Sequence, residues 1–471
     1  MLGMVTQTVL QRQIPDAYIV PVTINYEKVL EIDSIVHELK GGVKKLESFG
    51  GAVTGGIQRL RQNFGSVKVC FGDAVSLQET ILNAKAEAAE QGNANFDPSA
   101  NEEDRKALDR HLAFDVINRF HAELEISPTA LVSVLLLEQP TPGLTWGRIT
   151  HQVEWLSEQV KQRGGRLIHS RLCSAEAARK GVNLLGDHVH WSPETKRLRV
   201  RIDGGSEGNG TPPRPDRTSA LMLGYYRNTL MHLFAAEAFG AVVVSSFGET
   251  TAVEKGISTS GGLFSERMEV LRQAFRYEFV GLDTADAAVV SALETNGVLQ
   301  PAGTGSVKVA SARRFALLKE MLAPFVEAYW FLATQLGSLT TGGGIKARDL
   351  VSKFFEVGGS NHGLLYFPYC SADMVNNALK CLGKSGEGLL QTDSGGKITI
   401  VPGKEEALKK WAEALEDLRG SIDLSSQAEK EKKEVDMKEI PTIEDVMFEE
   451  QDKAGKKGLV ATLFSTSWIV R

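Results

Sequence analysis

The chain has 471 residues, of which 42% are hydrophobic and 24% are charged, as is usual for folded globular protein. This length is enough for two or three domains, each with its own hydrophobic core. The formal net charge of -6 disfavours a chain-wide nucleic-acid function, because binding phosphates needs a concentrated basic face.

The cysteines and the apolar segments narrow the class of protein further. Four scattered cysteines without a CxxC pair indicate neither a disulfide framework nor a zinc site, and therefore a reducing compartment. The first residues lack the apolar core of a signal peptide. The most apolar stretch, residues 221–247, is interrupted by charged residues and falls short of the roughly 20 apolar residues that cross a bilayer. We expect any membrane contact to be at the surface.

The first 90 residues have an α/β pattern. Residues 18–24 (YIVPVTI) form a short apolar run rich in β-branched residues, as expected of a strand buried on both faces. Residues 27–40 have a helical pattern, and residues 66–71 (SVKVCF) alternate like a second strand. The order strand, helix, strand predicts a parallel sheet.

Helices dominate the remainder. Polar residues 91–103 form a first linker, and Ser127 with Pro128 begins a helix as N-cap and first-turn proline. Residues 188–202 predict a hairpin. The segment 204–219, dense in glycine and proline, is the clearest linker in the sequence.

Two later segments repeat one order of features. Residues 292–309 and 378–400 each combine a helix end, a glycine, an apolar pair, a glutamine, a glycine turn and a β run. This repeat predicts two winged-helix-like modules. A winged helix invites a DNA-binding interpretation, but the acidic balance and the lack of a basic recognition helix favour a packing role.

Two residue pairs that contain histidine are candidates for metal binding or catalysis. His188 and His190 would share a strand face and could bind a metal ion, but a zinc site needs three or four ligands and no acidic or cysteine partners cluster nearby in sequence. A surface hairpin is the preferred interpretation. His111 and Asp115 share a helix face, where a local hydrogen bond is simpler than a general base. We assign no metal ligand and no catalytic residue.

Two glycine-containing turns are candidates for phosphate binding. Residues 50–56 (GGAVTGG) lack both the Lys-Ser/Thr ending of a P-loop and the order GxGxxG, so we expect a flexible entry to the next helix. Lys44 and Lys45 follow a glycine turn and could hold a phosphate dianion as point charges, although two exposed lysines are more often a solvated turn.

Three ordered motifs resemble one enzyme family. They are residues 19–27 (IVPVTINYE), 41–48 (GGVKKLES) and 63–77 (NFGSVKVCFGDAVSL). They are similar to the fourth block, the G-x-x-K-x-x-E-S turn and the N-F/Y-G-x-V/I strand of the glycerol-phosphate and dihydroxyacetone-phosphate acyltransferases. A weaker similarity, including the tripeptide Tyr226-Arg227-Asn228, extends to about residue 400. The dihydroxyacetone-phosphate branch looks nearer than the bacterial one.

The resemblance implies transfer of a fatty acyl group from acyl-CoA, a substrate rather than a cofactor, to the 1-hydroxyl of glycerol 3-phosphate or dihydroxyacetone phosphate. Family members use the His of an H-x4-D motif as base and its Asp to orient the His, and that motif precedes the strand that begins at Tyr18. We find no H-x4-D here, since His232 and Glu237 have the spacing but the wrong acid. We therefore expect this chain alone to be inactive. A truncated gene model, an alternative start or a fragment is the simplest account, and a pseudoenzyme is the alternative.

The resemblance also implies eight substrate-binding residues on two segments. It places Pro21, Val22 and Ile24 on a strand beside the acyl-chain pocket, and Tyr26 at the polar opening of that pocket. A turn that brings positive charge near the phosphate is formed by Lys44, Lys45, Glu47 and Ser48.

The predicted fold is an α/β N-terminal remnant of the acyltransferase domain followed by a mostly helical C-terminal region with small hairpins. The predicted domains are residues 1–90 (end of the acyltransferase domain), 104–203 (helical with a hairpin), 219–424 (helical with two helix–hairpin units) and 425–471 (charged tail).

The expected partners are acyl-CoA, glycerol 3-phosphate or dihydroxyacetone phosphate, and a peripheral membrane surface, without nucleic acid. The expected location is the cytosolic face of the mitochondrial outer membrane, the endoplasmic reticulum or the peroxisome, although the C-terminus is not an S-K-L-like tail. The competing hypothesis is a non-catalytic protein of the same ancestry that binds a partner or a membrane through its helical half.

Overall fold

The structure is a computed structural model in which the chain forms two compact units. The described residues are 2–43, 63–90, 92–93, 95–139, 143–202, 214–248, 251–280, 284–340, 344–360, 364–384 and 386–419. Unit 1 consists of Met1–Glu27, Gly65–Ser127 and Gly165–Ser170. Unit 2 consists of Lys28–Phe64, Pro128–Gly164 and Arg171–Arg471. The domain boundaries expected from the sequence stay a prediction.

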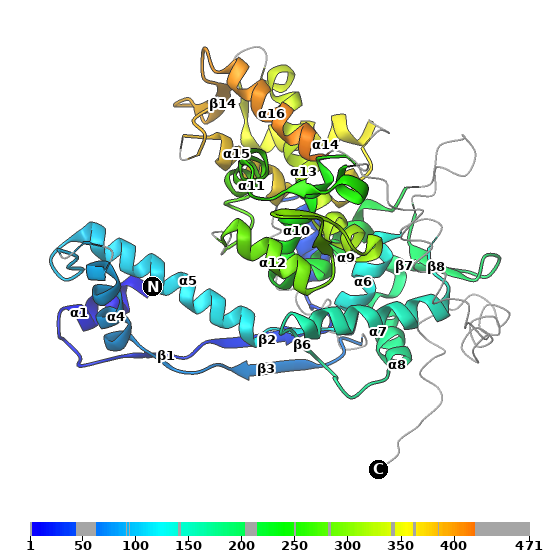
Figure 1. Ribbon diagram of the computed structural model, residues 1–471, viewed down its shortest axis with the longest axis horizontal. Coiled ribbons are helices and arrows are strands. Elements are labelled where there is room, and N and C mark those ends of the chain that lie inside the picture. The colour runs from blue at the N-terminus through cyan, green and yellow to red at the C-terminus, as the bar shows by residue number, and fades with distance from the viewer. Residues whose placement is uncertain are drawn as a thin grey trace, which may run out of the picture. The chain divides into compact units, whose positions relative to one another are not determined.

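Unit 1 combines three described helices with short strands (Figure 1). The helices are α1 (Leu2–Leu10), α4 (Leu77–Glu90) and α5 (Glu102–Glu123). The strands are β1 (Tyr18–Ile19), β2 (Val22–Tyr26), β3 (Val67–Phe71), β4 (Val75–Ser76), β5 (Glu125–Ile126) and β6 (Arg166–Leu167). A small apolar core of Val9, Leu77 and Leu112 holds the helices together.

The predicted parallel arrangement of the first two strands is wrong. β2 pairs with β3 in an antiparallel ribbon, from Val22 opposite Phe71 to Tyr26 opposite Val67. A parallel pair needs a crossover helix that packs on the sheet. The predicted helix is present as α2 (Ile32–Leu39), but it belongs to unit 2 and packs against another helix of that unit, α9 (Arg217–Asn228).

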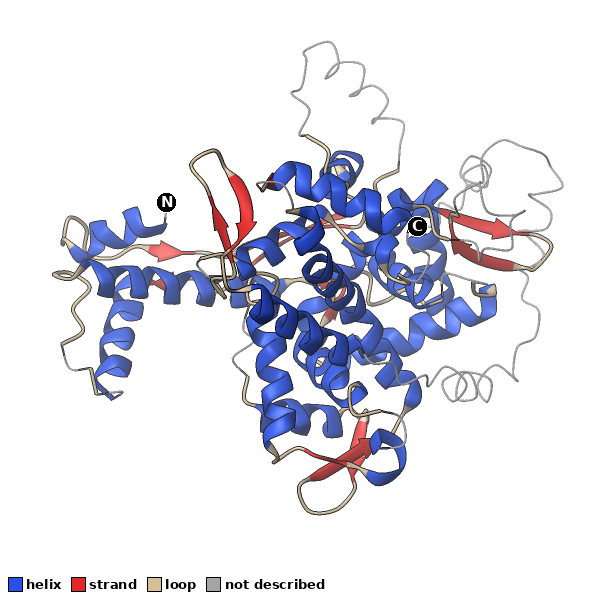
Figure 2. Cartoon of the chain, turned by 90° about the horizontal axis from the view of Figure 1, so that it is seen from above, coloured by secondary structure: helices blue, strands red, loops and turns tan. Residues whose placement is uncertain are grey.

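Unit 2 begins with a helical layer that carries one hairpin. Its other helices here are α6 (Pro128–Glu138), α7 (Trp146–Gln162), α8 (Ser174–Leu185) and α10 (Met231–Ser245). The hairpin is formed by β7 (Val189–Ser192) and β8 (Arg197–Val200). The helix start at Pro128 and the hairpin near residue 190 confirm the sequence predictions. The mostly helical character of the C-terminal region is confirmed as well (Figure 2).

The two predicted helix–hairpin repeats are present, and each has an additional strand. The first module contains α10, β9 (Ile257–Ser258), α11 (Gly262–Ala274), α12 (Asp286–Thr295), β10 (Leu299–Pro301) and β11 (Ser306–Val309). The second contains α13 (Ala312–Leu339), β12 (Ile345–Lys346), α14 (Ala347–Ser360), α15 (Ala372–Leu382), β13 (Leu390–Thr392) and β14 (Lys397–Ile400), and α16 (Glu405–Arg419) follows it. Each module has a three-stranded sheet. The second hairpin strand (β11 or β14) is central, with the first hairpin strand (β10 or β13) on one side and the strand near the start of the module (β9 or β12) on the other.

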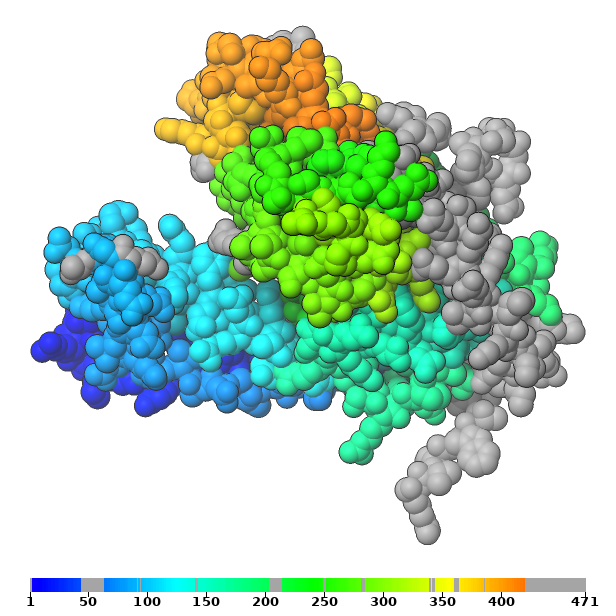
Figure 3. Space-filling model, viewed as in Figure 1, coloured from blue at the N-terminus to red at the C-terminus, as the bar shows by residue number. Residues whose placement is uncertain are grey.

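This order of helix, strand, two helices and hairpin is that of a winged helix, and the chain contains it twice. The two modules pack on each other through α10 and α13. Figure 3 shows the green surface of the first module beside the yellow-to-orange surface of the second. The first helix of each module is thus occupied by packing against the other module.

No single helix in the described ranges is both long and apolar enough to span a membrane. Among the described helices, α9 and α10 taken together reach the required length and composition, and the chain bends by 99° between them.

A buried ion pair joins α7 to α10, the first helix of the first winged-helix module. Arg163, at the end of α7, donates two hydrogen bonds of 2.7 Å to the Glu237 carboxylate on α10. Their side chains are only 5% and 6% exposed. Asn296, which ends α12, donates a third bond of 3.0 Å to Glu237. The carboxylate that has the motif-like spacing from His232 is therefore held in a structural contact.

Replacing Glu237 by Ala should lower the free energy of unfolding by about 3–5 kcal/mol, because it leaves the Arg163 guanidinium buried without its counter-charge. Urea denaturation would measure the loss. The matched control is Glu413→Ala, which removes a carboxylate that is 63% exposed from a surface pair with Lys409 and should change stability by less than about 1 kcal/mol. Equal effects of the two substitutions would contradict the structural role of Glu237.

Candidate functional site

The ribbon formed by β2 and β3 has its apolar side chains outside. Val22, Ile24 and Tyr26 of β2 are 39%, 52% and 39% exposed. Thr23 and Asn25, which alternate with them, are buried. Successive side chains of a strand point to opposite faces, so one face of β2 is polar and buried while the other is apolar and solvent-accessible.

The partner strand also exposes its alternate apolar residues, although the residues between them are not buried as they are on β2. Val67, Val69 and Phe71 are 54%, 47% and 72% exposed, and they lie directly opposite Tyr26, Ile24 and Val22. We call the surface made by these three cross-strand pairs the outer face. It consists of Val22, Ile24, Tyr26, Val67, Val69 and Phe71. In Figure 1 the two strands lie side by side.

Hydrogen bonds tie the polar face of the ribbon to the rest of unit 1, although Lys68 on that face is 50% exposed. Lys68, which pairs with Asn25 across the ribbon, donates to the buried Glu125 at 2.6 Å. Thr23 donates to the backbone carbonyl of Glu123, at the end of α5, at 3.4 Å. These contacts favour the inward orientation of this face, because a buried polar group without a partner is costly. Asn25 Nδ2 and one Glu125 oxygen are buried without a hydrogen bond among the described residues, so the face is only partly satisfied.

A cluster around Glu27 closes one end of the ribbon. The Glu27 carboxylate is fully buried and accepts hydrogen bonds from the Ser66 amide at 2.6 Å and the Ser66 hydroxyl at 2.7 Å. His169 Nε2 lies 3.0 Å from the carboxylate. Gly65 has a φ of +71°, and a Cβ there would lie 2.6 Å from a Glu27 oxygen. The glycine of the NFGSV segment is therefore required by this close approach.

Serine, histidine and glutamate together suggest a catalytic triad, but the geometry does not form a proton relay. The Ser66 hydroxyl and the Glu27 carboxylate both contact the same ring nitrogen, Nε2 of His169, at 3.2 and 3.0 Å. In a relay the acid holds one nitrogen and the nucleophile the other. Ser66 also donates to Glu27 itself. The cluster is a structural lock on the ribbon end.

The eight substrate-binding residues predicted from the sequence fall into two groups. Lys44, Lys45, Glu47 and Ser48 lie outside the described residues. Val22, Ile24 and Tyr26 lie together on the outer face, whereas Pro21 is buried and its carbonyl accepts from the Gly72 amide at 2.8 Å. The expectation that this strand is buried on both faces is wrong, because its outer face is open to solvent.

The residues that the sequence interpretation missed are Glu27, Ser66 and His169 of the lock and the β3 half of the outer face. One signal for them was present. Residues 22–27 (VTINYE) alternate strictly between apolar and polar types, a period that indicates a half-buried strand. The contact with His169 could not be anticipated, since it spans 142 residues of sequence.

The Y-R-N tripeptide on α9 has structural contacts. The Tyr226 hydroxyl accepts from the Val29 amide at 3.1 Å, and burial raises the pKa of Tyr226 to about 12. Arg227 is buried, which lowers its pKa to about 10, and it donates twice to the Asn228 side-chain oxygen.

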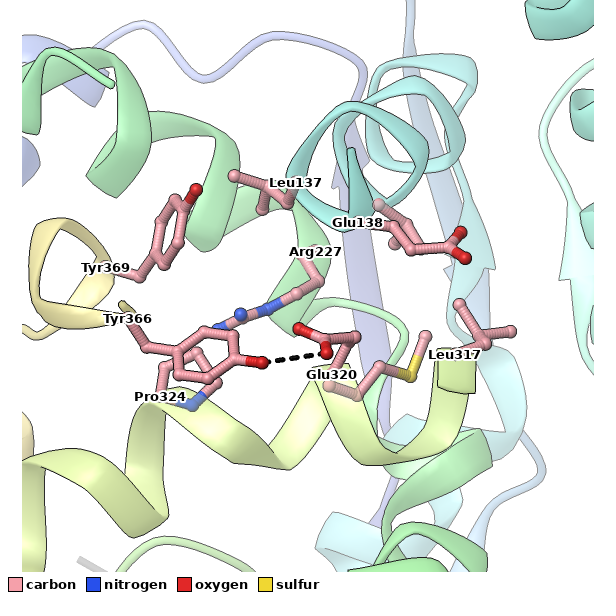
Figure 4. A pocket seen from close by; sticks show the side chains of 10 residues that line it. Leu137, Glu138, Arg227, Leu317, Glu320, Pro324, Tyr366 and Tyr369 are labelled. Atoms are coloured by element: carbon pink, nitrogen blue, oxygen red, sulfur yellow. Dashed lines mark hydrogen bonds between the residues drawn. The ribbon is translucent and has the colours of Figure 1, made fainter. Parts of the chain in front are cut away.

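Arg227 also lines a small pocket with Glu320, Tyr366 and Tyr369 (Figure 4). The Tyr366 hydroxyl donates to Glu320 at 2.7 Å, and burial raises the pKa of Tyr366. The cavity measures about 20 Å³, which is room for about one water molecule. It is too small for a phosphate or an acyl chain.

The histidine pairs do not assemble a site. His188 ends a short 3-10 turn, where its Nδ1 lies 3.1 Å from the Ser219 hydroxyl, whereas His190 lies on β7. On α5, Asp115 pairs with Arg119 at 2.9 Å. Within the part of the chain that the structure describes, no three His, Cys, Asp or Glu side chains are grouped as a metal site would require. The glycine-rich residues 50–56 lie outside that part.

Comparison with known proteins defines the class. Residues 36–392 match the model of the glycerol-3-phosphate acyltransferase C-terminal region. The match covers most of the chain, and the chain belongs to the glycerol-3-phosphate acyltransferase family.

Individual relatives agree with this assignment. Human dihydroxyacetone phosphate acyltransferase is 27% identical over 52% of this chain and 35% of its own length. A glycerol-3-phosphate acyltransferase of Alteromonas mediterranea is 27% identical over 64% of this chain and 34% of its own length. The mitochondrial glycerol-3-phosphate acyltransferase 1 of rat is 25% identical over 58% and 35%. The chain thus spans about a third of the length of these relatives.

Ser66→Ala provides a direct test of the lock. Removing the hydroxyl should lower the free energy of unfolding by about 1–3 kcal/mol, because it takes one donor from a buried carboxylate. The substitution should leave any hydrolysis of p-nitrophenyl acetate by the purified chain unchanged. A triad would show the opposite pattern, with ester hydrolysis lost and stability retained.

Proposed function

We propose that this chain is the C-terminal part of an acyl-CoA-dependent acyltransferase. The reaction esterifies the sn-1 hydroxyl of glycerol 3-phosphate or dihydroxyacetone phosphate, in phospholipid or ether-lipid synthesis. The family match over residues 36–392 and the names of the relatives support this proposal. The base that removes the hydroxyl proton is assigned to a part of the enzyme outside this chain, since the sequence contains no H-x4-D motif.

The observation that carries the acyl-chain role is the outer face. A fatty acyl chain is bound by apolar side chains that lose water when it enters. Val22, Ile24 and Tyr26 supply such side chains from one strand, and the Tyr26 hydroxyl would lie at the polar end. Pro21, buried at the start of the ribbon, would hold this strand in place through its carbonyl bond to Gly72.

The phosphate role is proposed for the turn at residues 41–48. Lys44 and Lys45 would attract the dianionic headgroup, and Glu47 with Ser48 would order the turn. The proposed location is the cytosolic face of an organelle membrane, and the name of the rat relative includes the word mitochondrial.

The exposed outer face also favours a second candidate function, a non-catalytic binding protein of the same ancestry. Such a protein would use its apolar surface to bind a partner without taking part in chemistry. The two candidates differ in whether residues of this chain change the kinetics of an active acyltransferase.

A fusion of this chain to the part of human dihydroxyacetone phosphate acyltransferase that precedes its C-terminal region distinguishes them. We expect the fusion to transfer acyl groups from acyl-CoA and the purified chain alone to show no turnover. Lys44→Ala with Lys45→Ala in the fusion should raise the KM for the phosphate acceptor by about tenfold or more, since two charges near a dianion are lost. The KM for acyl-CoA should not change, which serves as the internal control. An inactive fusion, turnover by the chain alone, or an unchanged acceptor KM would contradict the proposal.

A further inference from the structure

The hairpin formed by β7 and β8 in unit 2 carries a row of arginines on its solvent side (Figure 1). Leu198 and Val200 of β8 are buried. Arg197, Arg199 and Arg201 alternate with them and therefore lie on the opposite side of the hairpin. Successive arginines of the row are about 7 Å apart along the strand, so their like charges repel each other. An anion bound beside the row would offset that repulsion.

Two of the three arginines have no counter-charge in the part of the chain that the structure describes. The Arg197 guanidinium donates to the Gly143 carbonyl at 2.8 Å. The Arg199 Nε, in contrast, is buried without a hydrogen bond to any described residue. The Arg201 amide donates to the His188 carbonyl at 3.0 Å, which holds this residue in the ladder, while its side chain is exposed and forms no ion pair within the described ranges.

A cavity of about 320 Å³ opens beside this hairpin. Binding sites for small molecules usually measure about 300–1,000 Å³. One wall is formed by the hairpin and includes His190 and Arg201. The other wall is formed by the end of α8 and the short turn after it, and includes Asn183 and Asp187. All of these residues belong to unit 2.

The two walls differ in charge. Arg201 lines the hairpin wall, and Arg199 lies directly opposite His190 on the neighbouring strand, which brings a second guanidinium close to the cavity. The α8 wall has the Asp187 carboxylate, the Asn183 amide and the C-terminal end of a helix, which carries a partial negative charge. A simple anion would be attracted by one wall and repelled by the other.

A phosphomonoester whose organic part carries hydroxyl groups matches both walls. Its phosphate has close to two negative charges at neutral pH, and a guanidinium binds a phosphate through two parallel hydrogen bonds. Its hydroxyl groups can donate to carboxylate and amide oxygens, as those of Asp187 and Asn183. A carboxylate ligand would neutralise only one of the two arginines.

We propose that the cavity beside β7 binds a hydroxylated phosphomonoester, with the phosphate on Arg199 and Arg201 and the hydroxyl groups on Asp187 and Asn183. Glycerol 3-phosphate has this chemistry in solution, and 1-acylglycerol 3-phosphate presents it at a lipid surface. The site depends on the geometry of unit 2 alone. It goes beyond the proposed function, which assigns phosphate binding to the turn at residues 41–48.

Isothermal titration calorimetry of the full chain with glycerol 3-phosphate tests the site. All proteins carry Lys44→Ala and Lys45→Ala, so that the turn contributes no binding. This background should bind with a Kd of about 1 mM or below, the range of metabolite levels in cells. Adding Arg201→Gln should raise the Kd at least about tenfold, because a charge-assisted contact is lost. Arg348→Gln is the matched control, since it removes an exposed arginine of α14, and should leave the Kd unchanged.

Asp187→Asn separates a hydroxylated ester from a simple anion. Sulfate is a dianion without hydrogen-bond donors, so the Asp187 carboxylate should repel it and accept from glycerol 3-phosphate. The preference for glycerol 3-phosphate over sulfate should therefore fall at least about tenfold in this variant. Both substitutions should keep the melting temperature of the background, because the Arg201 and Asp187 side chains are exposed.

Vesicles distinguish the two sources of the ligand. Binding in solution identifies the free ester. Binding only to phosphatidylcholine vesicles that contain 1-acylglycerol 3-phosphate identifies the lipid, and Arg201→Gln should then abolish sedimentation of the chain with those vesicles.

The proposal is overturned if neither probe binds, or if Arg201→Gln and Arg348→Gln behave alike. It is also overturned if sulfate binds as tightly as glycerol 3-phosphate, or if phosphoethanolamine, with an ammonium group in place of hydroxyls, binds more tightly. An inactive acyltransferase fusion would contradict the proposed function and leave this site standing, because the calorimetry measures binding to the chain alone.

Discussion

The buried carboxylate of Glu27 fixes the orientation of the ribbon on which the functional argument depends. It accepts the amide and the hydroxyl of Ser66 and contacts His169 Nε2, all within 3.0 Å. Turning the ribbon over would expose these bonds to water and bury Ile24 and Val69 in their place. The observed orientation has the lower free energy, because leaving a carboxylate buried without a partner costs far more than leaving several apolar side chains half exposed. The apolar side is consequently the one exposed to solvent.

The family match relates this arrangement to a class of enzyme. A chain that spans about a third of its relatives' length contains the C-terminal region of an acyltransferase. Its motifs divide into two kinds. The Y-R-N tripeptide and the NFGSV segment are explained by contacts within the structure, through Tyr226, Arg227 and Gly65. The IVPVTINYE segment is only half explained, since Glu27 is held inside while Ile24 points to solvent. The unexplained half is the part for which we propose an acyl-chain role.

Local features of the fold were predictable from the sequence, whereas long-range ones were not. The helix start at Pro128, the hairpin near residue 190 and the two helix–hairpin repeats follow from capping, turn residues and repetition, which act within a few residues. The helix α2 lies between β2 and β3 in the sequence but belongs to unit 2, so it does not cross over the ribbon and the two strands pair antiparallel. No local sequence pattern predicts this. The Arg163–Glu237 pair likewise joins residues 74 positions apart. For the candidate site, alternation in residues 22–27 could have predicted one open face, but not that the polar side is the buried one.

Amide hydrogen exchange across β2 and β3 tests the central claim most directly. The rates would be compared in the fusion with human dihydroxyacetone phosphate acyltransferase, with and without a saturating long-chain acyl-CoA. If the outer face binds the acyl chain, the amides of both strands should exchange at least about tenfold more slowly with acyl-CoA bound, because opening the ribbon would also break the contacts with that chain. Equal exchange rates with and without acyl-CoA, with the fusion folded and active, would contradict the account.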